Sequence, residues 1–177
     1  MSALIRLFWD ICIFQRGPQD VPYSPFLLAI LLVIKLSFEF ATFLIPDAKG
    51  GTLPLGTVIP YLLVDAGASI LFVYFILWIH GRAVRGVQTI TTTLGIDIII
   101  GLAQLPLQYL ASSAGNQPNM LGLFYLGTMA VFVWELAIYT HVIRHAVSTS
   151  IFRAGGYALL LFILGFVVNY QMIPVSG

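Results

Sequence analysis

Charged residues are scarce in this sequence. Only 8% of the 177 residues are Asp, Glu, Lys or Arg, whereas 59% are hydrophobic. A soluble globular domain carries about 25% charged residues, and the mean hydropathy of this chain is +0.98. The shortage of charge therefore predicts that lipid rather than water surrounds most of the chain. The formal net charge of +1 also provides no field that would attract nucleic acid or an acidic substrate.

Cysteine and catalytic motifs are missing as well. Cys12 is the only cysteine, which excludes a disulfide within the chain and a cysteine-rich zinc or iron–sulfur site. We find no nucleophile motif, and Gly155-Gly156 does not follow a strand, so it is not a phosphate-binding loop. The sequence thus favours a protein that is not an enzyme.

Long apolar runs are what the chain has instead. Each of five runs is long enough to cross a hydrocarbon core of about 30 Å as a helix. Helices are expected because a backbone in lipid must satisfy its own hydrogen bonds, and the runs are too uniformly apolar for barrel strands. The sequence predicts an all-α integral membrane protein, a single domain of residues 1–177 built as a bundle of five transmembrane helices, over residues 24–45, 57–79, 88–110, 119–143 and 155–173.

A short amphipathic segment precedes the first run. Ser2, Arg6 and Asp10 recur every four residues and share one helix face, while the other positions are mostly apolar. Residues 3–14 are therefore predicted to form an interfacial helix that lies in the membrane plane and ends before Gly17-Pro18. No small-residue cleavage site follows, so we expect the segment to be retained rather than removed as a signal peptide. A disordered tail is the alternative.

The basic residues predict an orientation. With five spans, six arginines fall on one side of the membrane, and Lys49 is the only basic residue on the other side. The positive-inside rule then places the N-terminus in the cytoplasm and the C-terminus outside. The short loops favour the cytoplasmic (inner) membrane of a bacterium. The six arginines are Arg6, Arg16, Arg82, Arg85, Arg144 and Arg153.

Five charged residues fall inside the predicted spans: Lys35, Glu39, Asp65, Asp97 and Glu135. A charge at the centre of a transmembrane helix costs about 2.5–3.5 kcal/mol on insertion scales, so each should face the bundle interior and find a partner. Lys35 and Glu39 are four residues apart and can pair along one helix face. The assigned depths place Glu39 and Asp65 in the outer half and Asp97 and Glu135 towards the cytoplasm. Two interpretations stay open: an ion or proton path, or a polar cluster that fixes helix packing.

Three histidines form a second candidate site. His141 and His145 are four residues apart, the spacing with which one helix face presents two imidazoles to a metal. His80 ends the second span on the same side. These histidines predict a metal or haem site at the cytoplasmic end, with anchoring at the membrane interface as the alternative.

Three stretches carry a family resemblance: residues 17–22, with the sequence GPQDVP; residues 88–107, which contain Thr91-Thr92-Thr93; and residues 135–146. In these stretches and in its layout the chain resembles the Yip-type (Rab-GTPase-interacting) membrane proteins and their bacterial relatives. The resemblance implies five closely spaced helices, a cytosolic N-terminus and an external C-terminus. The long hydrophilic N-terminal region and the D-L-Y-G-P-type motif of eukaryotic members are lacking, so GTPase binding is not implied, and neither are catalytic residues.

Three functions are compatible with these features. The first is a non-enzymatic accessory, scaffold or assembly subunit that contacts membrane lipid and other membrane proteins or copies of itself. The second is a small proton- or ion-coupled transporter or channel that uses the buried carboxylates. The third is a metal or haem protein that uses the histidines. Nucleic acid is not expected as a partner.

The predicted orientation is testable with reporter fusions. A reporter in the turn at Ala83–Gly86 should report the cytoplasm, and one at the C-terminus should report the outside. The reason is that an odd number of predicted spans lies between this turn and the C-terminus. Both reporters on the same side of the membrane would rule out five spans in this orientation.

Overall fold

The computed structural model of the protein describes residues 2–44, 54–114 and 118–172. It is all-helical over these residues and contains a short N-terminal helix and five helices that are long and apolar enough to cross a membrane. This confirms the all-helical fold and the number of candidate spans. The elements are, in order, α1 (Ser2–Cys12), the 3-10 turn η1 (Pro18–Asp20), α2 (Pro25–Phe43), α3 (Leu55–Ile79), the 3-10 turn η2 (Ala83–Arg85), α4 (Gly86–Ala114), α5 (Pro118–Val147) and α6 (Ile151–Met172).

The helix ends follow local signals more closely than hydropathy. Ser24 caps α2, where its side chain accepts a hydrogen bond from the Leu27 amide at 3.1 Å, and Pro25 occupies the first helical position. α5 continues beyond residue 143 until Ser148, whose φ of 56° breaks the helix. α4 and α6 are likewise longer than their apolar runs, because helices extend into the polar zone where hydropathy no longer detects them. Residues 45 and 173, predicted as span ends, and Lys49 lie outside the described residues.

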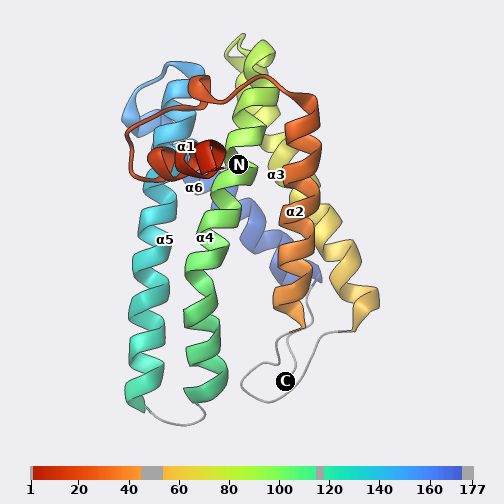
Figure 1. The fold of residues 1–177 in the computed structure, drawn as a ribbon, viewed down its shortest axis with the longest axis vertical. Coiled ribbons are helices and arrows are strands. Elements are labelled where there is room, and N and C mark those ends of the chain that lie inside the picture. The colour runs from red at the N-terminus through yellow and green to blue at the C-terminus, as the bar shows by residue number, and fades with distance from the viewer. Residues whose placement is uncertain (1, 45–53, 115–117, 173–177) are drawn as a thin grey trace.

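The helices run up and down, so that alternate connections gather at one end (Figure 1). α4 and α5 form a long antiparallel pair, α2 and α3 stand beside α4, and α6 crosses behind at a steep tilt. The segment between α1 and η1, the connection from α3 to α4 and the last turn of α5 lie at the upper end of this view. These segments contain Arg16, Arg82 with Arg85, and Arg144, respectively, and we call this end the arginine end. There the Arg85 guanidinium donates to the carbonyl oxygens of His145 and Ala146, at 3.3 and 3.1 Å, and ties η2 to α5.

The half of the bundle next to the arginine end is tightly packed. Ile138, Val142 and Ile143 of α5 are almost fully buried there. Thr91 and Thr92 of α4 are also buried, and their hydroxyls donate to the carbonyl oxygens of Val87 and Gln88, at 2.6 and 2.7 Å. These threonines satisfy their hydrogen bonds within their own helix, so they serve as packing residues in this core.

α1 lies across α4 and α5 in this same half (Figure 1). Phe8 and Cys12 are buried on its inner face, and the indole of Trp134 donates to the Cys12 carbonyl oxygen at 3.0 Å. Gly95 of α4 makes room for the Phe8 ring: a Cβ atom at residue 95 would lie 2.4 Å from it. Arg6 stays exposed, as its predicted polar face requires. α1 therefore covers the packed half of the bundle.

The contact between Phe8 and Gly95 predicts the effect of a single methyl group. Gly95→Ala should displace α1 and destabilise the protein by about 1–3 kcal/mol, because the new Cβ overlaps a buried ring.

Burial, with the nearby Asp97 carboxylate, raises the pKa of the Cys12 thiol to about 12, so alkylation should be slow in the native protein. Faster maleimide labelling of this single cysteine should report the displacement.

Gly122→Ala is the matched control, since a Cβ at this α5 position meets no atom within 4 Å. Unchanged labelling of Cys12 in Gly95→Ala, alongside an unchanged melting temperature, would contradict the proposed contact.

Candidate functional site

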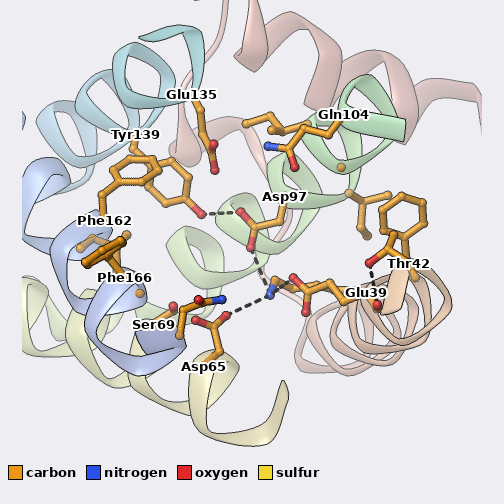
Figure 2. A pocket seen from close by; sticks show the side chains of 18 of the residues that line it. Glu39, Thr42, Asp65, Ser69, Asp97, Gln104, Glu135, Tyr139, Phe162 and Phe166 are labelled. Atoms are coloured by element: carbon orange, nitrogen blue, oxygen red, sulfur yellow. Dashed lines mark hydrogen bonds and ion pairs between the residues drawn. The ribbon is translucent and has the colours of Figure 1, made fainter. Parts of the chain in front are cut away.

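The Lys35 ammonium is the centre of the buried charges. Lys35 is only 5% exposed. Its Nζ lies 2.5 Å from Glu39 Oε1 on the same helix, 3.8 Å from Asp97 Oδ2 on α4 and 4.0 Å from Asp65 Oδ2 on α3. One cation thus holds three helices together by charge (Figure 2). The attraction between an ammonium and a carboxylate is far stronger in a site of low dielectric than at a protein surface.

α5 adds two polar side chains to this group. The Tyr139 hydroxyl donates to Asp97 Oδ1 through a short hydrogen bond, so both carboxylate oxygens of Asp97 are engaged. Glu135 lies one helical turn away from Tyr139 and directs its carboxylate into the same space, between Tyr139 and Gln104 in this view (Figure 2). Within the described part of the chain, no hydrogen bond or ion pair involves the Glu135 carboxylate. Glu135 is therefore the one cavity carboxylate outside the ion pairs of Lys35.

All five long helices line one cavity of about 680 Å³ around these groups. The cavity occupies the half of the bundle away from the arginine end. Along α4 its lining extends from Asp97 to Gln108, a rise of about 16 Å over eleven residue steps. That distance is about half the thickness of a hydrocarbon core. The cavity thus meets the packed half at the level of Lys35 and Asp97.

The wall of the cavity is polar and aromatic. Near the far ends of α3 and α6, the Asn169 amide donates to the Tyr61 hydroxyl at 3.4 Å. Asn169 and Thr128 are exposed, so the cavity reaches the surface of the bundle. The aromatic rings that line the cavity are Phe38, Tyr61, Tyr139, Phe162 and Phe166.

The predicted charged residues are brought together in the structure. All five line the cavity, and four of them share one set of ion pairs. One ammonium reaches Glu39, Asp65 and Asp97 at once, although only the pair with Glu39 followed from the spacing in the sequence. The long lysine side chain and the tilts of the helices, neither of which hydropathy shows, account for this.

The three histidines are arranged differently. The rings of His141 and His145 are tilted by 55° with centroids 4.5 Å apart, but His141 donates from Nε2 to the Arg16 carbonyl oxygen at 2.8 Å. His80 donates from Nδ1 to the Ile76 carbonyl oxygen at 2.9 Å and packs edge-on against Tyr157. Among the described residues, no three His, Cys, Asp or Glu side chains are grouped so that they could hold a metal ion. These contacts give His80 and His141 partners on the backbone of the protein itself.

Sequence reasoning missed Tyr139 and the aromatic part of the wall. A signal for Tyr139 was present, because it lies four residues after Glu135 and must share its helix face. No comparable signal marks Phe162 or Phe166, since aromatic residues also face lipid in any transmembrane helix.

Comparison with known proteins adds no assignment. No protein-family model, curated protein or solved structure matches the chain. The resemblance to Yip-type proteins therefore stays a prediction, and the site must be interpreted from its own geometry.

The ion pairs predict a specific coupling between Lys35 and Asp97. Lys35→Met should destabilise the protein by about 2–4 kcal/mol, because it leaves carboxylates buried without a cation. Adding Asp97→Asn should cost less in this background than in the wild type, because the repulsion that it relieves exists only without the ammonium.

The measurement is a double-mutant cycle of melting temperatures in detergent. Additive effects of the two substitutions would contradict the arrangement. Asp10→Asn provides the control, since Asp10 pairs with the exposed Arg16 at 3.3 Å outside the cavity and should contribute little.

Proposed function

We propose that the protein is a small membrane transporter or channel whose cavity binds cations, protons included, through its buried carboxylates. The observation that carries this proposal is the imbalance of charge in the cavity. Four carboxylates line it, and Lys35 is the single ammonium among them. Charged groups are costly in a membrane, and they persist where they mark an ion or substrate pathway.

The shape of the bundle supports a pathway rather than a purely structural cluster. A cluster that only fixed helix packing would be filled by its own side chains, whereas these carboxylates face about 680 Å³ of space. The cavity reaches the surface at one end and stops against the packed half at the other. In the predicted orientation this arrangement is a half-channel open to the outside, and α1 with the core of α4 and α5 closes the cytoplasmic side.

The accessory or scaffold role that the sequence favoured rested on the absence of a recognisable site. A cavity with converging charged groups removes that reason. The membrane would be the cytoplasmic membrane of a bacterium, in line with the short loops.

Proton flux in liposomes tests the proposal. Reconstituted protein should acidify or alkalinise the lumen when a pH gradient and a potassium diffusion potential are imposed. Glu135→Gln should reduce the rate at least about tenfold, because it removes the one cavity carboxylate that makes no ion pair with Lys35.

Asp10→Asn, which removes a carboxylate outside the cavity, should leave the rate unchanged. Equal rates for the wild type, Glu135→Gln and protein-free liposomes would exclude a proton pathway through these residues.

A further inference from the structure

We infer that the cavity binds an organic cation, an amine or quaternary ammonium that carries apolar groups. The inference rests on the proposed function and names its substrate class. Three features of the cavity support this inference: a carboxylate that makes no ion pair among the described residues, aromatic side chains in the wall, and a volume far larger than an inorganic ion requires.

Glu135 supplies the charge. Glu39, Asp65 and Asp97 surround the Lys35 ammonium, and the Tyr139 hydroxyl occupies the second oxygen of Asp97. The Glu135 carboxylate, free of partners among the described residues, faces the space beside Gln104 (Figure 2). A ligand cation placed there pairs with Glu135 without displacing Lys35. An anion placed there would meet the unmatched acid.

Aromatic rings supply the second part of the recognition. Phe162 and Phe166 of α6 line the cavity on the side of Tyr139, as Figure 2 shows. Phe162 packs edge-on against Tyr139 with centroids 5.7 Å apart, which fixes the position of both rings. Aromatic faces attract ammonium groups within about 6 Å, most strongly where water is excluded. Hydrated metal ions gain little from such walls, whereas amines with apolar substituents gain from both charge and surface.

The volume points to the same class. Cavities that bind small organic ligands measure about 300–1,000 Å³, and the cavity here holds about 680 Å³. It also provides polar side chains at the end where it reaches the surface, with Tyr61, Gln108 and Asn169 in its wall. An incoming ammonium therefore passes hydrogen-bonding groups before it reaches the aromatic section and Glu135.

The test compares a cation with a neutral molecule of the same shape. The full chain, purified in mild detergent, is titrated with choline, with benzyltrimethylammonium and with 3,3-dimethyl-1-butanol, the uncharged counterpart of choline. Both cations should raise the melting temperature saturably, because a ligand that binds only the native state stabilises it. The alcohol and an equal concentration of sodium chloride should produce no such shift.

Two variants locate the binding site. Glu135→Gln should weaken the binding of benzyltrimethylammonium at least about tenfold, whereas Glu135→Asp, which keeps the charge, should retain binding and controls for a folding defect. Asp10→Asn should bind as the wild type does.

Each other outcome overturns the inference. Equal shifts with the alcohol would show apolar binding, equal shifts with sodium chloride would show a general ionic effect, and no shift with either cation would show that the cavity does not take this class. Failure of the cation titration alongside proton flux that depends on Glu135 would leave the proposed function standing without this substrate. Loss of that flux as well would remove the proposed function itself.

Discussion

The Lys35 ammonium is the interaction on which the remainder of the bundle depends. Carboxylates from α2, α3 and α4 approach this one cation within 4.0 Å, and Tyr139 attaches α5 to the same group through Asp97. Lipid provides no hydrophobic force between helices, so their association depends on close packing and polar contacts. Replacing the ammonium would leave three acids facing one another where water is scarce, and the helices would have to separate or neutralise them.

The ion pairs of Lys35 lie at the boundary between a packed half and a hollow half of the bundle. On the arginine side of Lys35, small residues allow close approach, and the room beside Gly95 is filled by Phe8 of α1. At the level of the cavity, a Cβ at Gly101 would lie 2.5 Å from the ring of Phe38, so α2 and α4 also meet closely there. The helices that diverge are α5 and α6, since α6 tilts away to reach Tyr61 of α3. The ion pairs of Lys35 hold α2, α3 and α4 together, and the tilt of α6 leaves room for the cavity.

Much of this fold could be predicted from the sequence, because hydropathy records the solvent directly. Five apolar runs gave five helices, and the period-four polar pattern of Arg6 and Asp10 gave α1. Lys35 and Glu39 could be paired from their spacing, whereas the contacts of Lys35 with Asp65 and Asp97 depend on tilt and rotation, which a uniformly apolar helix does not encode. His141 and His145 had a metal-binding spacing, but the chain turn at Arg16 supplies the partner of His141 from 125 residues away. A sequence shows which side chains share a face of one helix, but it does not show which residue of another segment will contact them.

The pairing of Lys35 with Glu39 has a consequence for biosynthesis. α2 emerges from the ribosome ahead of α3 and α4, so Asp65 and Asp97 are not yet beside Lys35 when this helix enters the bilayer. Only Glu39, on the same helix and 2.5 Å from the ammonium in the finished bundle, is available to it at that moment. The nascent helix therefore enters the bilayer with its own counter-ion, and α3 and α4 later pack against a lysine that is already paired.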